Sequence, residues 1–122
     1  MIVNKINMKA VIVSGLREVK EIKKIASDYP TSWNVFPSAI YRTNSKPKAI
    51  DSEGNELQTT WTVTIELYSN NSLTDITDEV LSTFGEIGFF GTQKDANTAD
   101  LKRVVIELSA VVDNITKYVY SK

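Results

Sequence analysis

Two groups of carboxylates have spacings that could support chemistry. Asp51 and Glu53 could act as the acid pair of a glycosidase, and Asp75, Asp78 and Glu79 could hold a hard cation. Turn geometry explains the pair, which adjoins a Gly-Asn sequence, and the dipole of a predicted helix explains the three acids in its first two turns. We therefore predict neither a catalytic pair nor a metal site.

The residue types present narrow the chemistry further. The chain contains no His and no Cys, which removes the commonest general base, thiol nucleophiles and the usual ligands of zinc. Its five glycines do not take the spacing of a phosphate-binding loop, and no histidine is present to activate a serine. We expect a protein that is not an enzyme and that uses no cofactor.

Size and composition indicate one globular domain. The 122 residues are 42% hydrophobic and 24% charged, so we assign residues 1–122 to a single domain. No apolar run has the length of a membrane span, and the start of the chain lacks the features of a signal peptide, so we expect a cytoplasmic location. A pI near 5.4 without a cluster of basic and aromatic residues argues against specific nucleic-acid binding.

Charge is distributed unevenly along the chain. Residues 1–48 have nine basic and three acidic side chains, residues 49–100 have one and ten, and the remainder has four and two. The three blocks could mix in space as ordinary solvated surface. They could also make a polarised particle, in which a basic face of one copy meets an acidic face of the next, as ring assembly requires.

Alternating side chains predict a long hairpin. Apolar and polar residues alternate through residues 57–68, the period of a half-buried strand, and a second β-like run covers residues 36–43. The turn-rich stretch between them predicts a protruding loop at about residues 44–56. A further strand is predicted at 101–113, and residues 115–120 could be a closing strand or an extended tail.

Helical spacing marks two other regions. Residues 2–15 predict a helix that ends at Gly15, and residues 19–26 fit either its continuation or, as we prefer, a break and a short strand. The second helix is predicted between Ser72 as N-cap and the glycines at 85 and 88, with Leu73, Ile76, Val80, Phe84 and Ile87 on its apolar face. A polar loop at 92–99 is expected to be mobile or to be ordered only by a partner, and Trp33 is expected to plug the edge of the core.

Together these elements predict an α+β fold, with an antiparallel sheet that includes the long hairpin and two helices packed on one face. Odd-numbered residues of 57–67 and even-numbered residues of 104–112 are expected to face the helices. The opposite face, which includes Thr60, Thr62, Thr64 and Arg103, is suited to water or to another subunit.

The chain resembles the tail terminator proteins of long-tailed bacteriophages, also called tail-completion or head-tail joining proteins. The likeness covers residues 30–122 and lies in the aromatic and proline positions of 33–41, the polar hairpin with Lys46 and Pro47, the strand at 62–68, the helix at 72–88 and the strand at 102–113.

The resemblance implies a structural assembly protein that forms a ring, expected to be a hexamer. Such a ring caps the tail tube at its head-proximal end, stops polymerisation of the tube and offers its other surface to the head connector. The partners implied are other copies, the tail tube protein and the connector or stopper protein, first in the host cytoplasm and then in the virion. The residues expected to contact these partners are Lys46, Lys48, Asp51, Glu53, Lys94 and Asp95.

Two other functions fit the sequence. A head-completion or stopper component of the connector has a similar size and would bind portal proteins. A small cytosolic ligand-binding or enzymatic domain would instead enclose Asp51, Glu53 or Glu66 in a deep pocket. Residue by residue, the expected contact residues are also compatible with ordinary solvated loops.

Overall fold

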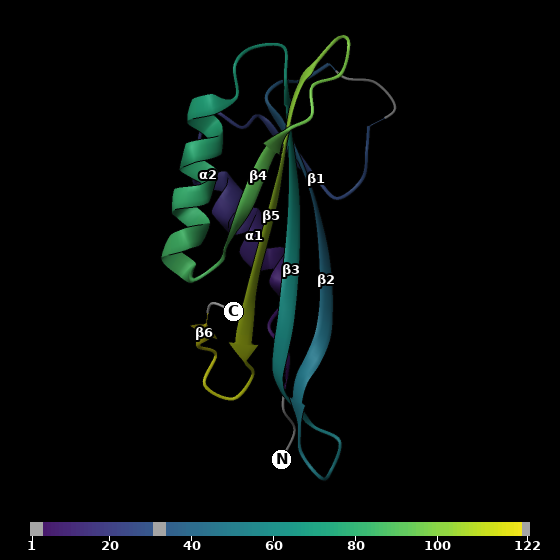
Figure 1. The fold of residues 1–122 in the computed structure, drawn as a ribbon, viewed down its shortest axis with the longest axis vertical. Coiled ribbons are helices and arrows are strands. Elements are labelled where there is room, and N and C mark those ends of the chain that lie inside the picture. The colour runs from purple at the N-terminus through teal and green to yellow at the C-terminus, as the bar shows by residue number, and fades with distance from the viewer. Residues whose placement is uncertain (1–3, 31–33, 121–122) are drawn as a thin grey trace.

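The computed structural model describes residues 4–30 and 34–120. Two helices and six strands fold into an α+β domain, so the predicted fold class is confirmed (Figure 1). Trp33 lies outside the described residues. Along the chain the elements are α1 (Met8–Arg17), β1 (Lys24–Ala26), β2 (Ser38–Ile50), β3 (Glu56–Ser69), α2 (Thr74–Ile87), β4 (Phe90–Asp95), β5 (Lys102–Asp113) and β6 (Val119–Tyr120).

The six strands form one sheet in the order β1-β2-β3-β5-β4, and β6 pairs with the end of β5. Every neighbouring pair is antiparallel except β1 and β2, which run parallel. The prediction of an antiparallel sheet therefore holds for all strands but the short first one. Because β3 already occupies one side of β5, β4 and β6 lie one after the other on the side of β5 away from β3.

Alternate residues of β3 and β5 form the core beneath the helices. Of the two sets predicted to face the helices, all even-numbered residues of 104–112 and the odd-numbered residues of 61–67 are in the core cluster, together with residues of α1 and α2. Leu57 and Thr59 are not in it. Helix α1 contacts β2 and α2 contacts β4, so each helix covers one half of the same sheet face (Figure 1). The two helices touch closely, because a Cβ on Gly15 would lie 2.8 Å from Cζ of Phe84. The cluster includes Met8, Ile12, Leu16, Trp61, Val63, Ile65, Leu67, Ile76, Val80, Phe84, Val104, Ile106, Leu108, Ala110 and Val112.

The hairpin loop is much shorter than predicted. Strands β2 and β3 remain paired from Ser38 with Tyr68 to Ile50 with Glu56, so only residues 51–55 form the turn and the expected loop at 44–56 is wrong. Gly54 has a φ of 87°, which glycine adopts without strain. The sequence pattern did not predict these parts of β2 and β3 because their residues are mostly polar. An edge strand that extends beyond the core does not need alternating apolar side chains.

The second polar stretch is also a strand. Residues 92–99 were predicted as a loop, but Phe90–Asp95 pairs with β5 as strand β4. Every residue of β4 is exposed, so the strand depends on its backbone hydrogen bonds and shows no apolar signal in the sequence. Lys94 and Asp95 therefore lie on a sheet edge and not on a mobile loop.

Several helix boundaries differ from the prediction. Helix α1 begins at Met8, where the Asn7 side chain accepts a hydrogen bond from the Ala10 amide at 3.2 Å, and it continues two residues beyond Gly15. The preferred break and short strand are confirmed, with β1 at Lys24–Ala26. The N-cap of α2 is Leu73, which has no capping side chain, so the prediction of Ser72 as N-cap is wrong by one residue.

The end of α2 is closer to expectation. Gly88 is a left-handed C-cap as predicted, whereas Gly85 lies inside the helix. Leu73, Ile76, Val80 and Phe84 are buried, but Ile87 is 36% exposed because it lies in the last turn, beyond the core. The closing strand β6 is limited to Val119–Tyr120.

Replacement of Gly91 by alanine tests how β4 is held. A Cβ at this position would lie 1.9 Å from the carbonyl oxygen of Glu107, so we expect Gly91→Ala to lower the free energy of unfolding by about 2 kcal/mol or more. The matched control is Gly85→Ala, whose Cβ would make only a 3.4 Å contact inside a helix and should stabilise by about 0.5–1 kcal/mol. Urea unfolding measures both. Equal effects of the two substitutions would show that β4 does not pack against β5 in this way.

Candidate functional site

The sheet has two open edges. Strand β1 covers only residues 38–40 of β2, so from Tyr41 to Ile50 the outer side of β2 has no strand partner among the described residues. The opposite edge consists of β4 followed by β6. Exposed edges of this kind readily pair with another strand, because their backbone N–H and C=O groups lack partners.

The two open edges lie at matching heights along the sheet. Residues 41–47 of β2 pair with residues 65–59 of β3, and β4 lies level with residues 62–67 of β3 through its pairing with β5. Val119 and Tyr120 of β6 lie level with Thr59 and Thr60 of β3, because both strands pair with the same residues of β5. Strand β2 also runs opposite to β4 and β6. A second copy turned about an axis parallel to the strands would thus present its β2 antiparallel to this edge.

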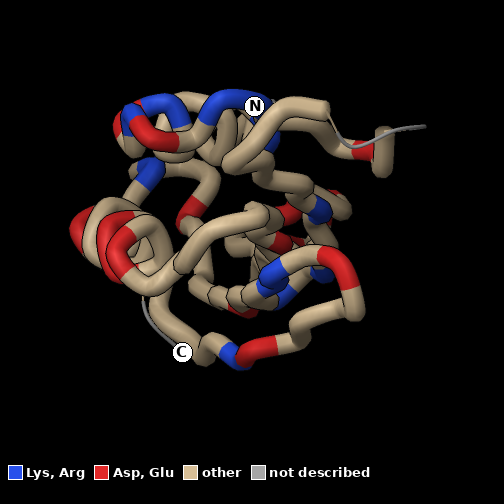
Figure 2. Tube along the Cα trace, turned by 90° about the horizontal axis from the view of Figure 1, so that it is seen from above, with Lys and Arg blue, Asp and Glu red and all other residues tan. Residues whose placement is uncertain are grey.

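The flanks of the two edges have opposite charge. Strands β1 and β2 contain four basic residues and no acid, whereas α2 contains four acids and no basic residue. The acidic residues of α2 are grouped on one side of the molecule, at the left of Figure 2. The basic set is Lys24, Arg42, Lys46 and Lys48, and the acidic set is Asp75, Asp78, Glu79 and Glu86.

The residues predicted to contact partners do not form one cluster in a single copy. Lys46 and Lys48 are exposed on β2, Glu53 is exposed in the hairpin turn, and Lys94 and Asp95 are exposed on β4 at the other edge. The residues on β2 and those on β4 lie on opposite edges of the sheet, and contact between two copies would bring these two groups together.

Asp51 has a structural role in the hairpin turn. Its carboxylate accepts hydrogen bonds from the Glu53 amide and from the amide and side chain of Asn55, at 2.9, 2.9 and 3.0 Å. The Asn55 side chain, helped by these amides, lowers the pKa of Asp51 below its usual value. The carboxylate therefore fixes the turn, which is the structural explanation that the sequence favoured.

The face of the sheet away from the helices contains a buried carboxylate, Glu66, which the sequence offers as a pocket residue of a ligand-binding or enzymatic domain. Glu66 is 1% exposed. It accepts hydrogen bonds from Tyr29 at 2.6 Å, from Nε of Arg103 at 3.0 Å and from Tyr68 at 3.2 Å, and an Arg42 nitrogen lies 3.1 Å away. No periodicity could reveal this network, because Tyr29 and Arg103 are each 37 residues from Glu66 in the sequence.

The ionisation of this network suits a structural role. Burial alone would raise the pKa of Glu66, but the hydrogen bonds from Tyr29 and Arg103 and the charge of Arg103 together lower it below its usual value. Burial, followed by the charge of Glu66, raises the pKa of Tyr68 to about 12. Glu66 is thus ionised and Tyr68 protonated at neutral pH, and the carboxylate is saturated by the chain's own donors.

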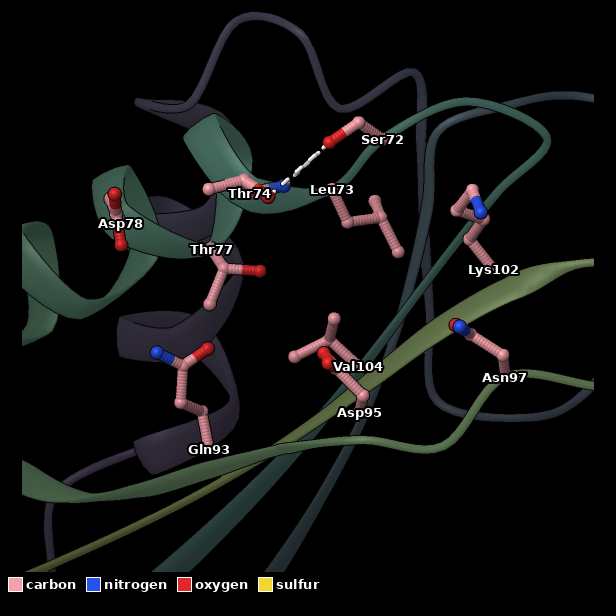
Figure 3. A pocket seen from close by; sticks show the side chains of 10 residues that line it. All are labelled: Ser72, Leu73, Thr74, Thr77, Asp78, Gln93, Asp95, Asn97, Lys102 and Val104. Atoms are coloured by element: carbon pink, nitrogen blue, oxygen red, sulfur yellow. Dashed lines mark hydrogen bonds between the residues drawn. The ribbon is translucent and has the colours of Figure 1, made fainter.

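A pocket of about 370 Å³ lies between the start of α2 and strands β4 and β5 (Figure 3). The Thr77 side chain points into it, and its buried hydroxyl has no hydrogen-bond partner among the described residues. The negative charges of Asp78 and Asp95 would repel an anion in this pocket, and Lys102 and the positive end of α2 would repel a cation. This mixed lining favours neither a phosphate nor a metal ion.

Comparison of the sequence with models of known protein families gives no match, and comparison with curated proteins gives none either. Across residues 4–30 and 34–120, no helix has the length and apolar character needed to cross a membrane. In the same residues, no group of three or more acidic side chains is placed to hold a metal ion. The sheet edges and their charged flanks are therefore the features on which a functional interpretation can be built.

Replacing Glu66 with glutamine tests its network. Because the pKa of Glu66 is lower in the folded than in the unfolded chain, its stabilisation is complete above the unfolded value of about 4.3 and is lost as pH falls through the folded value. We expect Glu66→Gln to lower the free energy of unfolding by about 2 kcal/mol at neutral pH and by less in acid. The control is Glu107→Gln, an exposed acid on the same face. A penalty independent of pH in urea unfolding would contradict the network.

The unpartnered hydroxyl of Thr77 gives a second prediction. Thr77→Val removes a buried polar group without breaking a hydrogen bond, so we expect unchanged or higher stability, by up to about 1 kcal/mol. The matched control is Thr59→Val, because the buried Thr59 hydroxyl donates to Glu56 and accepts from Asn114 at 2.9 Å. That control should destabilise by about 1–3 kcal/mol. A loss of stability in both variants would mean that Thr77 has a partner.

Proposed function

We propose that this chain is a structural virion-assembly protein that closes into a ring through its two open sheet edges and caps a phage tail tube. The observation that carries the proposal is the pair of open edges, which lie at matching heights on opposite sides of the sheet and run in opposite directions. A ring of identical copies needs two unlike patches that fit each other, and these edges are such a pair.

Charge supports the same arrangement. In a ring, the basic β1–β2 edge of one copy would approach the acidic α2 flank of the next, and opposite charges across an interface speed association and fix register. A closed ring also pairs every edge, which removes the risk of unlimited edge-to-edge aggregation. The resemblance implies six copies.

The hairpin and the one-sided helix layer explain how a ring could join two structures. Strands β2 and β3 extend past the helices to a turn at one end of the molecule (Figure 1). Lys46, Lys48, Asp51 and Glu53 would meet the tube or the next copy there, and Lys94 and Asp95 would meet the neighbouring copy along β4. The other end of the ring would remain for the head connector.

The alternatives lead to different observations. A stopper component of the connector would use the same ring but bind portal protein and not the tube. A ligand-binding or enzymatic domain built on Glu66 is disfavoured, because the chain's own donors already occupy that carboxylate.

The test combines native mass spectrometry with negative-stain imaging of the purified chain, mixed with tubes assembled from the tail tube protein that the proposal implies as its partner. We expect a closed oligomer and a ring on one end of each tube. Because opposite charges support the contact, rising salt should lower the ring fraction. Rings that bind portal protein and ignore tubes would favour the stopper role, and a monomer at all concentrations would overturn the proposal.

Two double variants with the same change of charge sharpen this test. Glu79→Lys with Glu86→Lys reverses half of the acidic α2 flank, and we expect at least about ten-fold weaker assembly, or about 1.4 kcal/mol. Asp28→Lys with Asp100→Lys adds the same charge on loops outside both flanks and should assemble as the parent does. Equal assembly of the two variants would remove the charged flanks from the mechanism.

A further inference from the structure

Exposed apolar side chains gather at one corner of the sheet. Of the eight large apolar side chains that are at least 36% exposed in the described part of the chain, five belong to the end of α2, the start of β4, and β6 with the turn before it. We name this set the β6 corner. Its members are Ile87, Phe90, Ile115, Tyr118 and Tyr120.

These segments lie against one another. A Cβ on Gly88 would lie 3.0 Å from Cγ1 of Val119, and one on Gly85 would lie 3.4 Å from Cε1 of Phe90. The turn that carries Ile115 is closed by a hydrogen bond from the Asp113 amide to the Tyr118 carbonyl at 2.9 Å. Exposed apolar patches of this kind on soluble domains commonly mark a protein interface.

One exposed apolar side chain lies near this height on the opposite edge. Ile50 ends β2 and is 57% exposed. Its neighbour Ala49 pairs with Gln58 of β3, Gln58 pairs with Asp113 of β5, and Asp113 bonds Tyr118. Ile50 itself pairs with Glu56, two residues beyond Gln58 along β3, so it lies about two residues past the level of Tyr118, on the opposite side of the sheet.

We propose that the β6 corner receives the hairpin end of a second copy of this chain, with Ile50 packed against Tyr118. The proposal rests on the ring proposed above and names its central contact. When a second copy sets its β2 antiparallel to the β4–β6 edge at equal height, Ile50 lies about two residues from Tyr118 along the strands, a diagonal separation that long side chains can bridge.

Charges beside the two patches are complementary. Lys46 and Lys48 precede Ile50 on β2, Asp51 and Glu53 follow it in the turn, and Glu86 and Asp113 border the corner. Backbone amides of Thr116 and Ile115, acting against slight desolvation, lower the pKa of Asp113, so it is charged at neutral pH. The basic residue of the corner, Lys117, donates to the carbonyl oxygen of Asn4 at 2.6 Å and is engaged within its own copy. The two lysines of β2 thus fit the acidic border of this apolar corner.

Cysteine cross-linking tests the contact directly, because the chain has no cysteine of its own. Ile50→Cys and Tyr118→Cys are made as separate variants, mixed and mildly oxidised. A disulfide forms only where Cα atoms approach within about 7 Å, so we expect a covalent dimer well above the level of either variant alone. The control mixes Ile50→Cys with Val35→Cys, another exposed apolar position, and should stay at background. The double variant Ile50→Cys with Tyr118→Cys should give a ladder of oligomers.

A second pair of variants measures the energetic role of Ile50. Ile50→Ser should weaken assembly at least ten-fold while the unfolding temperature of the monomer stays constant, since the side chain is exposed. Val35→Ser is the matched control and should leave assembly unchanged. An equal effect, or no effect, of the two substitutions would overturn the contact.

Native mass spectrometry of the same samples separates this inference from the proposed function. Rings without the cross-link between positions 50 and 118 would overturn the β6 corner and leave the tail cap standing. Cross-linked rings that bind no tube would support the corner and overturn the cap. A monomer at every concentration, without cross-link, would overturn both.

Discussion

The register of β3 between β2 and β5 is the constraint on which the rest of this structure depends. Strand β3 is paired along its length on both sides, and its odd-numbered residues form the core while Glu66 lies on the other face. A slip of one residue would put this carboxylate among the helices and expose Ile65. Glu66 opposes such a slip because it binds Arg42 of β2 and Arg103 of β5 at once. One buried charge therefore connects three strands, and Tyr29 joins the segment after β1 to the same point.

Sequence periodicity predicted the parts of the fold that the core determines. Residues 57–67 and 104–112 alternate because the helices cover one face, so their orientation could be read before the structure was known. This alternation of apolar and polar residues is absent where a strand does not contact the core. Residues 42–46 of β2 and 92–95 of β4 are polar strand segments held by backbone hydrogen bonds, which any side chain permits. The start of α2 was misplaced by one residue because a serine beside the helix is favoured by propensity, while packing of Leu73 sets the actual boundary.

The candidate site was less predictable than the fold, for a topological reason. Whether a strand lies at a sheet edge depends on which strands pair with it. The strand order β1-β2-β3-β5-β4 cannot be predicted from the spacing of apolar residues within any one segment. Lys94 and Asp95 were chosen as contact residues from a supposed loop, yet they lie on the edge opposite the hairpin. The acidic charge of the middle of the chain was visible in the sequence. Only the fold shows that α2 lies on the flank opposite the basic edge of β1 and β2 (Figure 1).

The open edge of β2 also has features that weaken its pairing with another strand, and these features limit how two copies can associate. Pro47 lacks a backbone N–H and the β2 register shifts beside it, while Lys46 and Lys48 place charge along the same edge. Such features weaken pairing between bare edges, as natural sheets do to avoid aggregation. In the proposed ring, edge pairing alone would then be insufficient, and association would also need the side-chain contacts of the charged flanks and of the apolar corner at β6. Since those contacts form together only when a neighbour is level and antiparallel, the same restraint that keeps single copies apart would select the one geometry that can close a ring.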